Sequence, residues 1–352
     1  MASGRRSRSP GDGTTAKLPL GKIPIDVLRA TVLSKTGAPS ERVATPPKAG
    51  LDFAAVRLPD GYLIVSADPI TGVSDMIGSY AVDVSANDVA TSGSRPQFIE
   101  SVVMLPEGSG EKELTIVAEQ MDARARALGI AIVGGHTEVT PGLRRPLVVV
   151  TAFALAKDYV SSQDARPGDR LMMTKTAGIE GTAAIAREPR TSGRLPVRLA
   201  QRAGGFLARL SIVEEAERAY RTGSVRAMHD CTEGGVLGAA FEMSLASGTG
   251  FTLEEGAVPV APETRSICSS LRLDPLRLIG SGSLLLAVQK GGEKRVADAL
   301  RGVAEVSVVG EFTREGRTLL KKDGSEVRVV SAPEDELWRV LGRGGWARNG
   351  LL

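Results

Sequence analysis

The chain has 352 residues, a length that favours two domains, with 42% hydrophobic and 24% charged residues as in a globular protein. Residues 1–17 hold four basic residues and one acidic residue, which accounts for the whole net charge of +3 and leaves a neutral body with no electrostatic footprint for nucleic acid. No apolar run approaches the roughly 20 residues of a membrane span, and the two cysteines lack disulfide-framework or metal-site spacing, so we expect no membrane association and a cytoplasmic location.

The first half of the chain predicts a domain with one sheet over residues 18–160. Residues 1–17 are polar, lack the apolar core of a signal peptide, and are expected to be a disordered basic tail. Hydrophobic patterning then predicts strands at 51–58 and 62–67 around a turn at 59–61, and a helix over 75–92. A strand at 97–105, a helix from about 114 to 128, and strands at 130–135 and 146–156 follow.

The second half predicts another layered α/β domain over residues 161–332, after a linker at 164–168. Strands are expected at 169–175, 225–230, 282–289 and 306–312, and helices at 197–220, 234–246 and 293–301, with a short helix after Gly178. Residues 333–352 are expected to form a short helix and a glycine-rich tail. The fold class is therefore α/β with two domains.

Four places combine acidic residues with strand ends or small neighbours: Asp52, Asp68, the pair Asn87-Asp88 and the pair His229-Asp230. Carboxylates at strand ends can converge on one side of a sheet, and oxygen ligands are what Mg²⁺ requires when it bridges a protein to phosphates. Each aspartate alone could equally cap a helix or make a turn. Four together favour a Mg²⁺ site.

Two glycine-rich turns are candidates for phosphate contacts. One is GGHTEVTPG at 134–142, after an apolar strand, and the other is TEGGV at 232–236, before a helix whose amides would favour an anion. The chain has no GxxxxGK[ST] and no GxGxxG motif, which removes the two commonest nucleotide-binding folds.

Several ordered motifs resemble one ATP-binding superfamily over nearly all of residues 18–332. They are GLDFAAV, SADP, SANDVATSGSRP, IVGGHTE, PGDRLMMTKTAGIEGTAAIARE, MHDCTEGGV and GSGSLLLAV. The chain resembles the AIR synthetase, selenophosphate synthetase, thiamine-phosphate kinase and HypE families, with HypE first. The resemblance implies a two-domain fold, homodimers whose first-domain sheets join into a barrel, and ATP near the domain junction.

Residue roles follow from the same resemblance. Asp52, Asp68, Asp88 and Asp230 match positions that hold Mg²⁺ and the ATP phosphates, and Asp88, Asp230 and His136 are the candidates for catalysis. The residues expected to line the nucleotide or the second substrate are Asn87, Gly134, Gly135, Thr137, Glu138, Thr232, Gly234 and Gly235.

Three departures from the family pattern bear on the second substrate. His136 stands where many relatives have an acidic residue, and imidazole is a poorer Mg²⁺ ligand than a carboxylate. HypE resembles this chain but acts on its own C-terminal cysteine, whereas here the last cysteine is Cys268. Glu233 replaces an arginine of the HypE pattern HDPTRGG, and Cys231 is expected to be buried rather than reactive.

These features predict an ATP- and Mg²⁺-dependent enzyme that transfers the γ-phosphoryl group to an acceptor, or activates an amide- or carboxylate-like oxygen. One alternative is a non-catalytic nucleotide-binding factor for maturation or assembly. Another is a true AIR synthetase, which the HDCTEGG sequence disfavours. The expected partners are ATP, an acceptor that the sequence does not identify, and a second copy of the chain.

Overall fold

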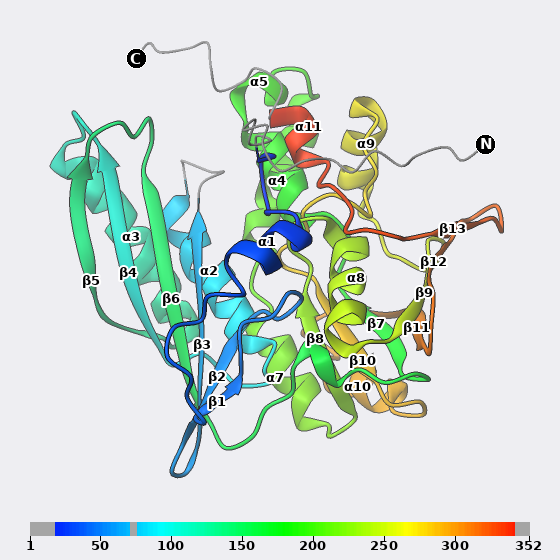
Figure 1. Cartoon of the computed structure of the whole chain (residues 1–352). Helices are drawn as coiled ribbons and strands as arrows, with labels where there is room; N and C mark the ends of the chain where they lie inside the picture. Colours follow the sequence, from blue (N-terminus) through cyan, green and yellow to red (C-terminus); the bar gives the residue numbers. More distant parts are fainter. Residues whose placement is uncertain (1–17, 71–75, 342–352) are drawn as a thin grey trace, which may run out of the picture.

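The computed structural model describes residues 18–70 and 76–341. Residues 1–17, which we expect to be disordered, and the expected tail after residue 341 are outside the described range. A six-stranded sheet and a seven-stranded sheet lie side by side (Figure 1), and both carry helices. The mixed α/β class predicted from the sequence is confirmed.

The first sheet has the strand order β1-β2-β3-β6-β4-β5. Its strands are β1 (Val43–Thr45), β2 (Ala54–Leu58), β3 (Gly61–Ile70), β4 (Phe98–Pro106), β5 (Ala131–Thr140) and β6 (Leu147–Ala156). Among the described residues of this sheet, β4 and β5 pair in parallel and the other neighbouring strands pair antiparallel. β2 and β3 form the predicted hairpin, with Leu58 opposite Gly61.

Two helices cover one face of this sheet, namely α2 (Ile77–Ala90) and α3 (Glu111–Leu128). Alternate residues of β6, from Val148 to Ala154, are fully buried beneath α2, as the two-residue period of a strand requires. α3 ends at Gly129 in a left-handed conformation, the C-terminal signal expected from the sequence. A short helix, α1 (Ile25–Thr31), precedes the sheet.

The second sheet has the order β13-β12-β9-β11-β7-β10-β8. Its strands are β7 (Arg170–Thr174), β8 (Val225–Asp230), β9 (Gly250–Glu254), β10 (Leu284–Val288), β11 (Val306–Thr313), β12 (Arg317–Leu320) and β13 (Glu326–Arg328). The helices are η1 (Ser162–Asp164), α4 (Ile179–Arg187), α5 (Pro189–Ser192), α6 (Val197–Gly204), η2 (Gly205–Arg209), α7 (Val213–Arg221), α8 (Gly235–Ser247), α9 (Pro262–Leu271), α10 (Glu293–Ala299) and α11 (Leu337–Leu341).

The single helix predicted over 197–220 is wrong, because the structure divides it into α6, η2 and α7. The break lies at residues 210–212, where the side chain of Asn87 on α2 forms hydrogen bonds with the backbone. Its side-chain amide donates to the Leu210 carbonyl at 2.8 Å and its carbonyl accepts from the Ile212 amide at 2.9 Å. A partner from the other domain therefore takes the groups that a continuous helix would have paired internally.

The turn predicted at 134–142 is wrong over most of its length, because strand β5 continues through Thr140. Parallel pairing with β4 holds this segment extended, with Gly135 opposite Ser101 and His136 opposite Val102. A Cβ at Gly135 would lie 2.0 Å from the Ser101 carbonyl oxygen, so this glycine lets the two strands approach each other. The other turn, at 232–236, opens α8 as expected.

Candidate functional site

Two carboxylates of the candidate site come from the hairpin of the first domain. Asp52 lies just before β2, and Asp68 lies on β3. The Ser66 hydroxyl bonds to the Asp52 backbone carbonyl at 2.8 Å and to Asp88 Oδ2 at 2.7 Å. Ser66 therefore connects the start of β2, strand β3 and helix α2 at one point.

Asp88 is supplied by the last turns of α2, which lies across β3 and β6. Its side chain is buried, accepts a hydrogen bond from Ser66, and lies close enough to Asp68 for that carboxylate to act on its pKa. Burial, together with the nearby charges of Asp68 and Asp230, raises the pKa of Asp88 well above its usual range. The predicted convergence of Asp68 and Asp88 is therefore present in the structure.

Asp230 reaches the same place from the second domain, where β8 ends. It is 1% exposed, and His229 Nδ1 lies 3.8 Å from its Oδ1. In the part of the chain that the structure describes, neither of its carboxylate oxygens has a hydrogen-bond partner, nor does Oδ2 of Asp52. Asp52, His229 and Asp230 each offer one ligand atom, and these atoms all lie within 4.8 Å of one another. We call Asp52, Asp68, Asp88 and Asp230 the aspartate cluster.

The charges in this cluster repel one another inside the protein. Burial raises the pKa of Asp52 to about 6, although His229 opposes the shift. Burial and the charge of Asp52 raise the pKa of Asp230 well above its usual range. Unpartnered buried carboxylate oxygens are costly unless a cation compensates them. The arrangement therefore suits a cation, and oxygen ligands are those that Mg²⁺ prefers.

Two basic residues and one glutamate surround the aspartate cluster. His229 Nε2 lies 3.1 Å from Asp52 Oδ1 and 3.3 Å from Glu242 Oε2. Burial alone would lower the pKa of His229, but Asp52 and Glu242 raise it to about 9. Lys22 Nζ lies 3.1 Å from both Glu242 oxygens and 3.3 Å from Thr232 Oγ1. The pKa of Glu242 is lowered to about 2 because Lys22 and His229 outweigh the effect of its burial.

Sequence reasoning missed Lys22 and Glu242 at the site. Lys22 lies in a short segment before α1 with no motif of its own, and Glu242 lies in the middle of the apolar helix α8. The one available signal was the position of Glu242, because a charge among the buried residues of a helix needs a partner. Its partners come from both domains, which no local pattern reveals.

The turn at 232–235 is partly occupied by side chains of this chain. The Gly234 amide donates to Asp335 Oδ2 at 2.7 Å. Glu233 accepts hydrogen bonds from the Lys22 amide at 2.6 Å and from Trp338 Nε1 at 3.0 Å. The segment before α1 and the helix α11 thus meet at the start of α8. The predicted contact of Thr232, Gly234 and Gly235 with phosphates stays a prediction.

The other predicted nucleotide residues lie elsewhere in the chain. Gly134, Gly135, His136, Thr137 and Glu138 lie on β5, the exposed outer edge of the first sheet. This edge is three strands from β3, or about 14 Å. His136 Nε2 lies 3.1 Å from Glu138 Oε2 in an exposed pair. Within one chain the structure does not bring this pair to the aspartate cluster.

Two further residues singled out in the sequence, Asn87 and Cys231, are fully buried near the aspartate cluster. Asn87 is fully buried, and its side-chain amide joins the two domains through the backbone of residues 210 and 212. Its predicted contact with nucleotide stays a prediction. Cys231 is fully buried next to Asp230, and burial raises the pKa of its thiol well above the usual range. The expectation that Cys231 is buried is confirmed, and its lack of reactivity stays a prediction.

Comparison with known proteins identifies a matching family and similar proteins. Residues 50–156 match the N-terminal domain of AIR synthase related proteins, and residues 166–322 match their C-terminal domain. The carbamoyl dehydratase HypE of Escherichia coli (strain K12) is 31% identical over 286 residues, which are 79% of this chain and 81% of that protein. The carbamoyl dehydratase HypE of Cupriavidus necator is 30% identical over 281 residues, 76% and 78% of the two chains.

Solved structures give the same picture of the fold. The crystal structure of E. coli HypE has a TM-score of 0.68 at 25% identity, and the match covers 89% of this chain and 99% of that one. A hydrogenase maturation protein HypE in complex with ATP has a TM-score of 0.68 at 22% identity, covering 89% and 95%. Thiamine monophosphate kinase from Aquifex aeolicus has a TM-score of 0.64 at 17% identity, covering 86% and 97%.

Proposed function

The chain belongs to the AIR synthase related family, and we propose that it is an enzyme that uses ATP and Mg²⁺ to transfer the γ-phosphoryl group to an oxygen of a second substrate. That oxygen belongs to a phosphoryl acceptor, or to an amide- or carboxylate-like group from which it then leaves as part of the phosphate. The relatives named carbamoyl dehydratase favour the amide oxygen, because a dehydratase must turn a carbonyl oxygen into a leaving group.

One observation carries this proposal: among the described residues, three buried carboxylate oxygens, two of Asp230 and one of Asp52, lack a hydrogen-bond partner. A purely structural cluster would satisfy such atoms with hydrogen bonds. Oxygen donors at this density suit a hard divalent cation. The aspartate cluster would hold Mg²⁺, which when bound would neutralise the charge of the phosphates.

The residues around the aspartate cluster have separate proposed tasks. His229 sits between Asp52 and Glu242 and orients the carboxylate of Asp52. Lys22 places a positive charge beside Thr232, at the start of α8, where it would meet a phosphate oxygen. A relative with ATP bound supports the nucleotide part of this proposal, since it shares the fold over most of both chains.

Neither cysteine of this sequence suits the role of an acceptor thiol. The sequence holds only Cys231 and Cys268, and both are buried. Burial raises the pKa of Cys268 to about 12, so it is neither exposed nor ionised. Free, buried thiols also suit the cytoplasmic location that we propose, and no helix among the described residues is long and apolar enough to cross a membrane.

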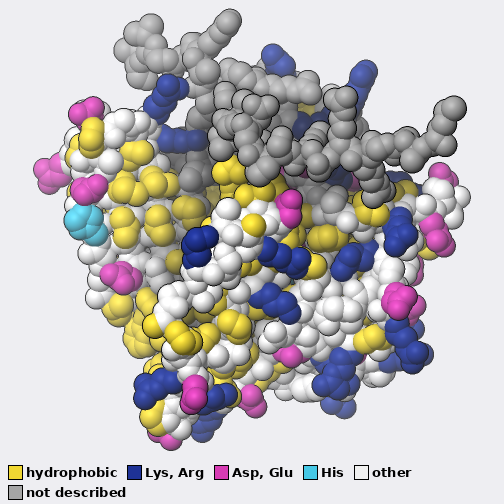
Figure 2. Space-filling view, viewed as in Figure 1, with side chains coloured by type: hydrophobic (Ala, Val, Ile, Leu, Met, Phe, Trp, Pro, Cys, Tyr) yellow, Lys and Arg dark blue, Asp and Glu magenta, His cyan; other side chains and the backbone are white. Residues whose placement is uncertain are grey.

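We further propose a homodimer formed through the first sheet. The sheet face opposite α2 and α3 is apolar, and Figure 2 shows hydrophobic side chains gathered over this part of the molecule. Exposed side chains include Phe98 and Leu155 on this face, and Ile132, Val133 and Val139 on the edge strand β5. A second copy would cover this face and the β5 edge, which otherwise has unpaired backbone groups. It would also place residues 134–138 in the dimer interface.

The experiment that tests the catalytic proposal is ATP hydrolysis followed by phosphate release. We expect slow hydrolysis in Mg²⁺ that stops in EDTA and that is lost in the variant Asp230→Asn. Binding of ATP without any Mg²⁺-dependent turnover, with or without carbamoyl or amide compounds, would instead support a nucleotide-binding assembly factor. The maturation role of HypE relatives makes that the principal alternative.

A further inference from the structure

Lys175, which follows the end of β7, has a left-handed backbone conformation with φ of 54°. Among the described residues other than glycine, only Arg272 shares this conformation, and Arg272 caps the C-terminal end of α9, where such a backbone is common. Lys175 has no such position, because a strand precedes it. A strained backbone of this kind persists only when its surroundings hold it in place, and the side chain of Lys175 supplies contacts that do so.

The ammonium group of Lys175 joins two separate segments of backbone. Nζ donates to the carbonyl oxygens of Arg209 at 3.1 Å, Ser211 at 2.7 Å and Gly282 at 2.9 Å. It also lies 2.7 Å from Oε1 of Glu215, in an ion pair whose side chains are 12% and 4% exposed. A buried charge with these partners is fixed in position. The ammonium therefore ties the segment after η2 to the segment before β10.

The segment after η2 supports the helix that carries Asp88. The Asn87 side chain donates to the Leu210 carbonyl at 2.8 Å and accepts from the Ile212 amide at 2.9 Å. Asn87 directly precedes Asp88 on α2. Lys175 binds the carbonyls on either side of Leu210, so it holds the same stretch of backbone to which α2 is attached.

The segment before β10 supports the strand end that carries Asp230. The first residue of β10 lies opposite Asp230 in the sheet, and the Cys231 amide donates to the Ser283 carbonyl at 3.0 Å. A Cβ at Gly282 would lie 2.6 Å from the Arg209 carbonyl oxygen, so the two segments touch each other at this glycine. The ammonium of Lys175 therefore lies between the backbone supports of two carboxylates from the aspartate cluster.

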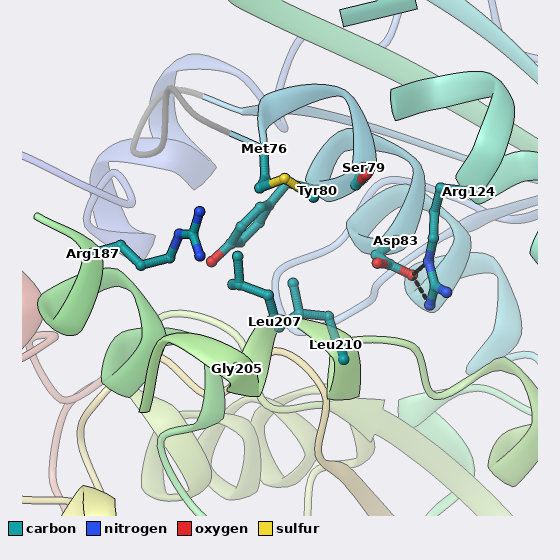
Figure 3. Close-up of a pocket in the computed structure, with 10 residues that line it drawn as sticks. Met76, Ser79, Tyr80, Asp83, Arg124, Arg187, Gly205, Leu207 and Leu210 are labelled. Carbon is teal, nitrogen blue, oxygen red and sulfur yellow. Dashed lines mark hydrogen bonds and ion pairs between the residues drawn. The ribbon is translucent and has the colours of Figure 1, made fainter. Parts of the chain in front are cut away.

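Apolar packing leaves the contact between α2 and the segment before Leu210 incomplete. A cavity of about 320 Å³ is lined by residues of α2 and by residues 205–210. Figure 3 shows Leu207 and Leu210 on one side of this cavity and α2 on the other. Well-packed interiors hold few voids larger than a water molecule. Hydrogen bonds therefore have a larger share in aligning these two segments than they would in a filled core.

We propose that Lys175 is a positioning residue for the aspartate cluster, and that its ammonium holds the supports of Asp88 and Asp230 at the separation that one cation requires. This inference rests on the proposed function, because it assumes that the cluster binds Mg²⁺. Lys175 acts through backbone carbonyls and not by contact with the cation. Without its ammonium the two segments can shift separately, and the cluster loses affinity for the cation while the fold remains.

The test compares the Kd for Mg²⁺, measured by calorimetric titration with MgCl₂ alone, in the full chain and its variants. Lys175→Met together with Glu215→Gln removes the ammonium, keeps the volume of both side chains and leaves no unpaired buried charge. We expect the Kd to rise by about tenfold or more, as when partners that orient metal ligands are removed. The matched control is Arg226→Met with Asp169→Asn, which removes another ion pair of the second domain, at the start of β8. The control should leave the Kd unchanged.

Two further variants separate positioning from stability. Lys175→Gly with Glu215→Gln also removes the ammonium, but glycine favours the left-handed backbone, so this variant should fold even where Lys175→Met does not. Its Kd should rise in the same way. Asn87→Ala should raise the Kd too. Combined with the Lys175→Met variant, it should have less than the product of the two separate effects, because both side chains hold the same backbone segment.

A Kd for Mg²⁺ that both Lys175 variants leave unchanged would overturn the proposal, even if their melting temperatures fall. An equal rise in the Arg226 control would overturn it as well, since general loosening of the domain would then explain the loss. Effects of Lys175 and Asn87 that multiply in full would show that the two do not act through one segment. A parent protein that binds neither Mg²⁺ nor Mg-ATP would contradict the proposed function instead, so the two failures are distinguishable.

Discussion

Asp230 shows how much of this site depends on single residues from distant parts of the chain. Its own position, at the end of β8 beside a glycine pair, is visible in the sequence. The sequence does not reveal that its two oxygens lack hydrogen-bond partners or that Asp52 lies beside it, because both features follow from the packing of one domain on the other. Sequence patterns identified the carboxylates but missed Lys22 and Glu242, which set the local charge balance.

At the residue scale, the pKa of Asp52 predicts how Mg²⁺ binding depends on pH. A protonated carboxyl is not a ligand, so cation binding competes with protons. With a pKa of about 6 in the folded, metal-free protein, Asp52 is mostly ionised above that pH and protonated below it. We expect the affinity for Mg²⁺ to fall as the pH drops below about 6, by about tenfold per pH unit for each ligand carboxyl that is protonated. Titration with MgCl₂ alone, followed by calorimetry, measures this. An affinity that does not change over this range would contradict the role of Asp52.

A second residue-scale prediction concerns the turn before α8. Gly235 has φ of 62°, and a Cβ there would lie 2.7 Å from the carbonyl oxygens of Leu276 and Leu278. Gly235→Ala should therefore lower the free energy of unfolding by about 1–3 kcal/mol for the backbone conformation, and further for the steric clash. Gly223→Ala is the control, because Gly223 has φ of 68° but open space around it. If urea-induced unfolding shows that the two variants lose the same free energy of unfolding, the structure around residue 235 has relaxed and relieved the clash.

At the scale of elements, β5 carries the predicted dimer contact. Val133 and Val139 are exposed on this edge strand, and charges there should prevent a second sheet from packing. We expect the double variant Val133→Lys with Val139→Lys to sediment as a monomer at micromolar concentration, while the parent sediments as a dimer. Val197→Lys, a change at an exposed valine on α6, should leave the dimer intact. A parent protein that is monomeric would contradict the homodimer.

The elements themselves were largely predictable, since strong two- and 3.6-residue periods mark most of them. β8 occupies 225–230 as expected, and α2, α3 and α8 begin and end within about three residues of their predicted limits. The short strands β1, β9, β12 and β13 and the helices α1 and α9 were not foreseen, because short or weakly patterned segments depend on tertiary contacts. The break after η2 depends on Asn87 in the other domain.

At the scale of the whole molecule, the two domains share one continuous core. Side chains of α2 and the first sheet pack in the same cluster as Leu210, Ile212 and residues of α7 and β10. The aspartate cluster and the contacts of Asn87 with residues 210 and 212 both lie along this junction. The domain limits expected from the sequence, 18–160, 161–332 and 333–352, stay predictions. A junction that holds both explains why neither could be assembled from the sequence of one domain alone.

The central claim is that the aspartate cluster binds Mg²⁺ together with ATP, and Asp88→Asn tests it most directly. The change keeps size and hydrogen bonding but removes a carboxylate whose pKa is already raised by burial. The matched comparison is Asp169→Asn. Asp169 is also buried, but it pairs with Arg226 at 3.1 Å, outside the cluster.

The measurement is the melting temperature with and without Mg-ATP at about 100 times its Kd, which stabilises the parent by about 2.7 kcal/mol. We predict that Asp88→Asn keeps its metal-free melting temperature and loses the Mg-ATP shift, and that Asp52→Asn and Asp230→Asn lose it too. Asp169→Asn should melt lower but keep the shift. If Asp88→Asn, Asp52→Asn and Asp230→Asn all respond to Mg-ATP as the parent does, the cluster is not the metal site.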